Sequence, residues 1–143
     1  MQLILLFSLS LFCPLFSGSE GLEDLGKRLS LSPPKQGDFD PILEVVQEEF
    51  NALKFHNFEK AYFFYTSKEF KKKTSLKEFI LFIKSNSVLL NNQSLLVQDI
   101  KIDREIAYYK GVATSLSGVS RKINFQLVLE DGRWKILGIQ LEN

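Results

Sequence analysis

Alternating apolar and polar residues dominate the second half of the chain. The pattern is clearest where Ile123, Phe125 and Leu127 alternate with polar side chains, and Asp131-Gly132 then separates this run from the next. Asp-Gly supplies the positive φ angles that a two-residue hairpin turn requires. Short connections make neighbouring strands antiparallel. The pattern predicts a four-stranded antiparallel sheet with strands at residues 95–102, 105–116, 119–130 and 134–141.

Helical periodicity precedes the strands. Asp40-Pro41 suits the N-cap and first position of a helix. An apolar stripe with helical spacing follows through about Phe55, formed by Leu43, Val46, Phe50 and Leu53. Asn57 can cap a second helix. Thr66 with Glu69, and Ser75 with Glu78, match the capping-box pattern, and the second pair begins a third helix. Helices followed by strands predict an α+β fold, with N-terminal helices packed on a curved four-stranded sheet.

The first residues are typical of targeting. Residues 1–19 contain no charged side chain, and their apolar run suits a signal peptide better than a spanning helix. Two alternatives remain: an unprocessed apolar tail, or a lipoprotein with lipid on Cys13. We expect cleavage after Ser19 and export to the periplasm or the medium. Residues 20–38 then form a flexible leader, and residues 39–143 form the folded domain.

Charge and residue counts narrow the function classes. The net charge is +1, with 18 basic and 17 acidic side chains, which argues against nucleic acid as a partner. Cys13 and His56 are the single cysteine and histidine, so we expect no metal site and no cofactor. After cleavage no stable membrane span remains. Asn92-Gln93-Ser94 would accept a glycan in a eukaryotic secretory pathway.

The order of the elements and the last hairpin, Asp131–Ile136 (Asp-Gly-Arg-Trp-Lys-Ile), resemble the nuclear transport factor 2-like superfamily. Within it the ending is most similar to uncharacterised exported families. The resemblance implies a cone-shaped α+β domain. It also implies many functions, because the superfamily holds isomerases, dehydratases, cyclases, transport factors and assembly proteins.

Acid–base residues of the enzyme members are hard to find. Isomerases of this class place carboxyl groups around a dry pocket. Most acids of the predicted sheet fall in or beside turns, and Asp99 alternates with Lys101, so it is expected at the surface. His56 sits between Phe55 and Asn57 at a helix boundary, where a cap or surface role is usual.

Aromatic and amide side chains are the remaining site candidates. If Gln98 shares the inner face with Leu96 and Ile100, it contributes a polar tip to an otherwise apolar cone. The alternative is a filled core in which these polar tips bond to their neighbours. The predicted ligand-binding residues are Tyr62, Tyr65, Gln98, Tyr108 and Trp134.

The second sheet face is also apolar. Leu137, Ile139 and Leu141 alternate with Trp134 and Ile136 and are predicted to form a homodimer interface. Scattered surface hydrophobic residues are the alternative. The combined hypothesis is an exported, non-catalytic binding or assembly domain for a small apolar ligand. The alternatives are a small-molecule isomerase, lyase or cyclase using the cone pocket, and an accessory domain that holds a partner protein.

We predict that protein isolated from its native host begins near Glu20, because the uncharged apolar segment before it has the features of a signal peptide. Mass spectrometry of the intact chain measures this directly. A full-length chain retained in the cytoplasm would contradict export, and a lipid on Cys13 would replace cleavage after Ser19 with lipoprotein processing.

Overall fold

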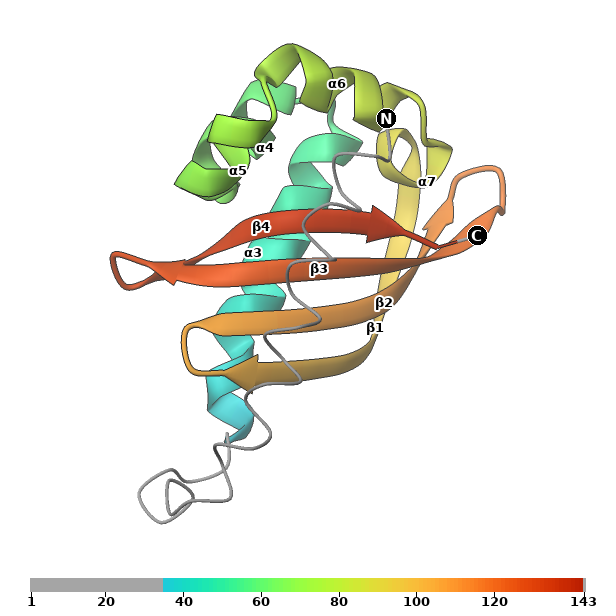
Figure 1. The fold of residues 1–143 in the computed structure, drawn as a ribbon. Helices are drawn as coiled ribbons and strands as arrows, with labels where there is room; N and C mark the ends of the chain where they lie inside the picture. Colours follow the sequence, from blue (N-terminus) through green and yellow to red (C-terminus); the bar gives the residue numbers. More distant parts are fainter. Residues whose placement is uncertain (1–34, 143) are drawn as a thin grey trace.

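The computed structural model describes residues 35–142, and the predicted signal peptide, Cys13 and most of the leader lie outside them. Helices come first and strands follow, as in an α+β fold (Figure 1). The helices are α3 (Gln36–Lys54), α4 (Phe58–Tyr65), α5 (Lys68–Lys73), α6 (Leu76–Lys84) and α7 (Ser87–Leu90). The strands are β1 (Asn92–Asp103), β2 (Ile106–Ser115), β3 (Ser120–Glu130) and β4 (Arg133–Leu141).

The long helix α3 begins earlier than the Asp-Pro pair suggested. Its first residue is Gln36, and Pro41 lies inside the helix. The Asp38 carboxylate accepts a hydrogen bond of 2.8 Å from the backbone N–H of Lys35, which satisfies a donor at the helix start. Residues 36–38, which the sequence assigned to the leader, are therefore helical.

Side-chain caps separate the short helices. Asn57 caps α4, and Ser75 and Glu78 form the predicted capping box of α6. The predicted box at Thr66 is wrong, because Ser67 caps α5 instead. The Thr66 hydroxyl donates to the carbonyl oxygen of Tyr62 and is buried. A hydroxyl one residue further along thus takes the capping role.

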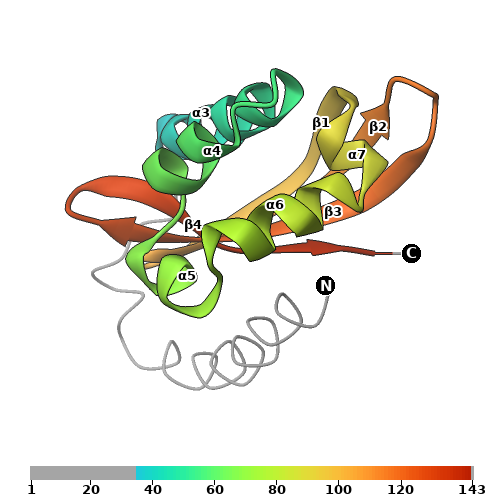
Figure 2. The same cartoon turned by 90° about the horizontal axis from the view of Figure 1, so that it is seen from above.

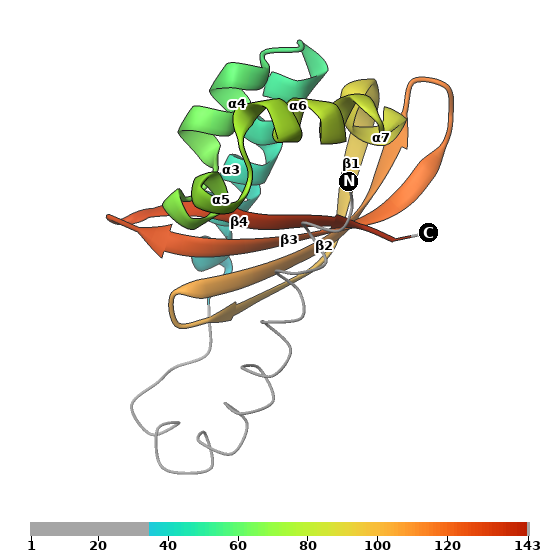
Figure 3. The same cartoon turned by 45° about the horizontal axis from the view of Figure 1, so that its top comes forward.

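The four strands form one antiparallel sheet in the order β1-β2-β3-β4, as predicted. The last turn has the predicted geometry, with φ of 50° at Asp131 and 81° at Gly132. Helix α3 crosses one face of the sheet, and α7 lies beside the start of β1 (Figures 2 and 3). No helix among residues 35–142 is long and apolar enough to cross a membrane.

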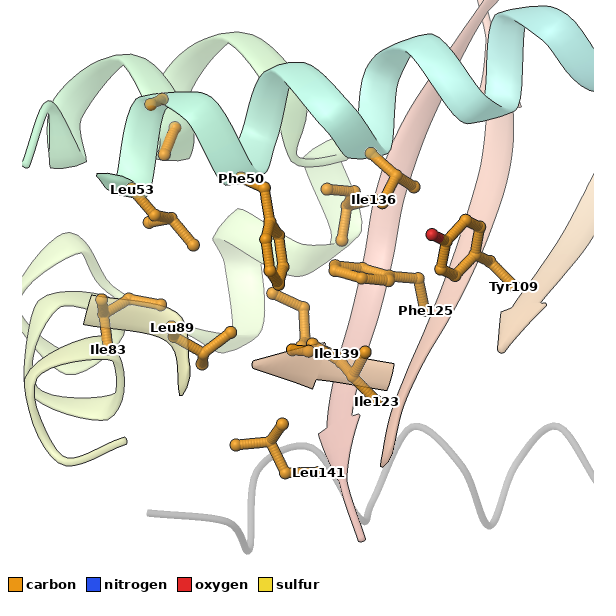
Figure 4. Packing of buried hydrophobic residues seen from close by; sticks show 14 of the residues in the cluster. Phe50, Leu53, Ile83, Leu89, Tyr109, Ile123, Phe125, Ile136, Ile139 and Leu141 are labelled. Atoms are coloured by element: carbon orange, nitrogen blue, oxygen red, sulfur yellow. The ribbon is translucent and has the colours of Figure 1, made fainter. Parts of the chain in front are cut away.

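The core lies between the helices and the inner face of the sheet, with α3 at its centre (Figure 4). Phe50 of α3 packs edge-on against Phe125 of β3, with ring centroids 6.1 Å apart. Tyr109 of β2 packs against the other side of Phe125 at 5.6 Å. Each such buried side chain contributes about 1.5–3 kcal/mol through removal of its apolar surface from water. This layer of rings fixes how α3 lies on the sheet.

A β-bulge in β4 overturns the predicted interface strip. Leu127 pairs with Ile136, but Gln126 pairs with Gly138, so Leu137 is the extra residue. The bulge turns Ile139 and Leu141 onto the same inner face as Ile136, where they are 1% and 7% exposed. Leu137 is the one member of the strip that stays half-buried at the surface. Self-association of two chains stays a prediction.

A second bulge re-aims β1. Val97 pairs with Gly111 and Asp99 pairs with Lys110, which leaves Gln98 as the extra residue. Gln98 is exposed, so its predicted place inside the cone is wrong. Beyond the bulge Ile100 pairs with the inward-facing Tyr109, and Asp99 is exposed on the other face, as expected of a surface carboxylate.

Asn92 has a structural role that is incompatible with a glycan in the folded domain. Its side chain is buried, and its amide nitrogen donates hydrogen bonds of 3.1 Å to the carbonyl oxygens of Phe50 and Leu89. These bonds join the start of β1 to α3 and α7. A sugar on this nitrogen would displace both partners.

Glu49 is the polar exception in the core. It is 0% exposed on the buried face of α3, between Val46 and Leu53, and neither carboxyl oxygen has a hydrogen-bond partner. Burial raises the pKa of Glu49 well above its ordinary value, because the charged form loses its hydration and gains no partner. The folded protein therefore holds a proton on Glu49 more tightly than the unfolded chain does.

We predict that Ile139→Lys unfolds the domain or lowers its free energy of unfolding by roughly 3 kcal/mol or more, because the ammonium group would replace apolar contacts in the core. Urea denaturation followed by circular dichroism measures the effect. Gln140→Lys, on the opposite side of β4, is the matched control and should change stability by about 0.5 kcal/mol at most. An Ile139→Lys protein as stable as the wild type would contradict the buried placement.

We predict that Glu49 makes the wild type less stable as the pH rises. Its contribution is fully present below the ordinary pKa of 4.5 and is lost as the pH rises from there through the raised folded-state pKa. The difference in unfolding free energy between wild type and Glu49→Gln should therefore fall with pH. Glu48→Gln, a change at the exposed neighbour, should keep the decrease of unfolding free energy with pH that the wild type shows. Parallel pH curves for wild type and Glu49→Gln would exclude the effect.

Candidate functional site

A cleft of about 650 Å³ opens between α3, the end of α4 and the β3–β4 hairpin. Each of the three elements contributes lining residues that lie close together in its own part of the sequence. Its lining residues are Pro41, Glu44, Val45, Glu48, Phe63, Phe64, Tyr65, Gly132, Arg133, Trp134 and Lys135.

Aromatic side chains form much of the cleft wall. Phe63 and Phe64 lie near the end of α4 and are 53% and 61% exposed, which is unusual for phenylalanine. The half-buried Tyr65 and Trp134 pack against the edge of the core. Trp134 lies opposite Leu129 in the hairpin register, two residues before the inward-facing Ile136. The cleft therefore presents flat apolar surfaces that lie beside the core and are open to solvent.

The charged lining residues are segregated by sign. Glu44 and Glu48 come from α3, one turn apart, and share one side of that helix. Arg133 and Lys135 come from β4. The Lys135 ammonium donates a hydrogen bond to the carbonyl oxygen of Phe64, which fastens the hairpin to α4. The cleft thus has one acidic wall and one basic wall.

Tyr65 connects the cleft to a second hollow. Burial raises the pKa of Tyr65, and the Glu48 carboxylate raises it further as hydrogen-bond partner and as neighbouring charge. The nearby Glu49 makes a smaller contribution in the same direction. Tyr65 and Glu48 also line a smaller hollow of about 300 Å³ beside Phe55 and Lys60. The Tyr65 hydroxyl therefore stays protonated at neutral pH and can donate a hydrogen bond.

The structure brings together two of the five predicted ligand-binding residues. Tyr65 and Trp134 line the cleft. Tyr62 is buried and donates a hydrogen bond of 2.5 Å to the carbonyl oxygen of Thr74, so it belongs to the core. Tyr108 lies half-buried opposite Lys101 and Gln126 on the outer sheet face, and Gln98 lies exposed at the β1 bulge.

Three acidic residues of α3 were not predicted as site candidates, because the sequence pattern drew attention only to the acids of the sheet. Glu44 and Glu48 carried no signal, because exposed helical glutamates are common. Glu49 did carry a sequence signal, because it lies three residues after Val46 and four before Leu53 and so interrupts the apolar stripe of α3. Tyr109, not Tyr108, faces the interior, where burial raises its pKa to about 12.

Other polar candidates have structural roles. His56 occupies the connection between α3 and α4 with φ of 58°, contacts the Leu90 carbonyl oxygen at 3.3 Å and stacks on Phe58. Its ring is exposed, as expected of a boundary residue. Within residues 35–142 no group of three His, Cys, Asp or Glu side chains is arranged to hold a metal ion.

Solved structures share the fold. One, a nuclear transport factor 2-like protein of unknown function from Methylobacillus flagellatus, is 18% identical with a TM-score of 0.58, over 77% of this chain and 96% of that one. A second, from Shewanella oneidensis and also of unknown function, is 13% identical with a TM-score of 0.55, over 73% and 98%. At these identities the likeness concerns the fold alone. The search of curated proteins gives no significant match.

A family profile matches the whole described domain. The match covers residues 35–143 and is described as Domain of unknown function (DUF4864). It spans every helix and strand from α3 to β4. With this match the chain belongs to the DUF4864 family, and its fold is the one seen in nuclear transport factor 2-like proteins.

Proposed function

We propose that this domain binds a small ligand with an apolar body in the cleft between α3, α4 and the β3–β4 hairpin, and that it does so after export. The observation that carries the proposal is the exposure of Phe63 and Phe64 on the wall of a formed cleft. Exposed aromatic surface costs free energy in water, and a ligand that covers it recovers part of that cost. The proposal of export is supported by the uncharged, apolar character of residues 1–19.

The size and lining of the cleft support the same function. Pockets for small molecules are typically about 300–1,000 Å³, with apolar walls and a few polar groups that orient the ligand. Here the apolar surfaces are the four aromatic side chains and Val45, and charged side chains border them. The only tryptophan of the chain, Trp134, lies in this wall. Its fluorescence therefore reports on the site.

Binding is favoured over catalysis by the state of the carboxyl groups. A general base needs both access to its substrate and a pKa tuned towards the working pH. Glu44 and Glu48 border the cleft but are exposed, where carboxylates are well solvated. Glu49 has the shifted pKa, but both its oxygens are sealed from the surface. The glutamates that a ligand can reach are therefore different residues from the enclosed carboxyl group of Glu49.

An isomerase-, lyase- or cyclase-type enzyme is the second candidate, and Glu49 is the observation that favours it. A buried, unpartnered carboxyl group with a raised pKa is a frequent feature of active sites. In this case substrate must reach Glu49. A ligand that does so must change the pH dependence of stability that Glu49 produces, whereas a ligand confined to the cleft leaves it unchanged.

We predict that 3-phenyl-1-propanol, a neutral aromatic probe, changes Trp134 emission saturably, with a dissociation constant on the order of millimolar for so small a ligand. Phe63→Ala combined with Phe64→Ala should weaken binding several-fold, because stacking surface is lost. Leu81→Ala is the matched control, since Leu81 is 47% exposed and lies outside the cleft. Absence of saturable binding, or equal weakening in the control, would contradict the proposed site.

A further inference from the structure

Opposite charges border the cleft from different elements. Glu44 and Glu48 lie one turn apart on α3, so their carboxylates share one wall. Arg133 and Lys135 are alternate residues of β4, and they supply the other charged wall. Trp134, Phe63 and Phe64 provide the apolar surface of the same cleft.

These charges do not neutralise one another. The described ion pairs join Lys68 to Asp131 at 3.7 Å and Lys72 to Glu69 at 3.9 Å, and both lie outside the cleft. Among residues 35–142 no ion pair joins either glutamate of α3 to either basic residue of β4. Each nitrogen is therefore more than 4 Å from each carboxylate oxygen. A ligand placed between the walls can approach both without breaking a salt bridge.

One of the four charged groups is already held in position. The Lys135 ammonium is fixed by its hydrogen bond to the Phe64 carbonyl oxygen and keeps two further N–H donors. The Glu48 carboxylate lies close enough to the Tyr65 hydroxyl to raise its pKa. Groups that are fixed before binding lose less conformational entropy when the ligand arrives. The basic wall therefore carries one charge that is fixed before the ligand arrives.

We propose that the ligand is a zwitterion with an aromatic side chain, of the free α-amino acid type. This rests on the proposed function of the cleft. The ammonium group binds the carboxylates of Glu44 and Glu48, and the carboxylate binds Arg133 and Lys135. The guanidinium of Arg133 matches a carboxylate in two parallel hydrogen bonds. The ring packs on Phe63, Phe64 and Trp134.

Ligands with a single charge fit the walls less well. An organic amine satisfies the α3 wall but leaves Arg133 facing a like charge. An organic acid satisfies Arg133 and is repelled by the two glutamates. A neutral ligand displaces water from the charged groups without offering them an opposite charge, so it compensates less of their lost hydration and binds more weakly. Only a ligand carrying both charges compensates both walls.

Three probes with the same ring test the inference: L-phenylalanine, phenethylamine and 3-phenylpropanoate, each titrated against the full folded domain and followed by Trp134 emission. We expect L-phenylalanine to bind at least about tenfold more tightly than either of the others, a difference of about 1.4 kcal/mol. The advantage should shrink as salt is added, because the charges are at the surface.

Variants assign the two walls. The double variant Glu44→Gln, Glu48→Gln should bind L-phenylalanine about as weakly as the wild type binds 3-phenylpropanoate. The variant Arg133→Gln should bind L-phenylalanine about as weakly as the wild type binds phenethylamine. Glu59→Gln and Lys72→Gln remove exposed charges outside the cleft and should leave binding unchanged. Circular dichroism confirms that each variant is folded.

The outcomes separate the two claims. Equal binding of all three probes and of 3-phenyl-1-propanol would overturn the zwitterion while the cleft remains a binding site. Preference for phenethylamine or for 3-phenylpropanoate would overturn it in favour of a singly charged ligand. Failure of every probe, the neutral alcohol included, would overturn both the zwitterion and the proposed function.

Discussion

The packing of α3 across the sheet is the contact on which the rest of the structure depends. Phe50 meets Phe125 at the centre of the inner face, and Tyr109 supports Phe125 from β2. Bulges in β1 and β4 turn the ends of these two strands towards the same layer. The mature chain of the predicted form has no cysteine. Its stability must then come from this apolar contact, because no disulfide can restrict the unfolded state.

The cleft is a consequence of that packing. Helix α3 has 19 residues, and its first turns extend past the ring layer towards the β3–β4 hairpin. The segment between α4 and α5 pairs with the edge of β4, where the Ser67 N–H donates to the Ile136 carbonyl oxygen at 2.8 Å. Lys135 adds a second tie to α4. These links hold α4 beside the hairpin and leave its last aromatic residues at the rim, where Phe63 and Phe64 have no core to enter.

Glu49 shows that the core is not optimised for stability alone. A buried carboxyl group without partners costs roughly 1–3 kcal/mol for each unsatisfied group, and an apolar side chain at this position would avoid that cost. Its neighbours Val45 and Glu48 line the cleft, so Glu49 lies on α3 beside the cleft wall. The cost and the location together are what favour an enzymatic function as the second candidate.

The sequence by itself determined the class of fold, the order of strands, the Asp131-Gly132 turn and the capping of α4 and α6, because these depend on local periodicity and on backbone preferences of single residues. It also contained the mark of the β4 bulge, since Ile136-Leu137 breaks the alternation before Gly138. Only the tertiary structure decided which face each strand end presents, because one extra residue reverses every side chain beyond it. The cleft joins α3, α4 and β4 from distant parts of the chain. Its charged walls therefore became visible only when packing placed these three elements side by side.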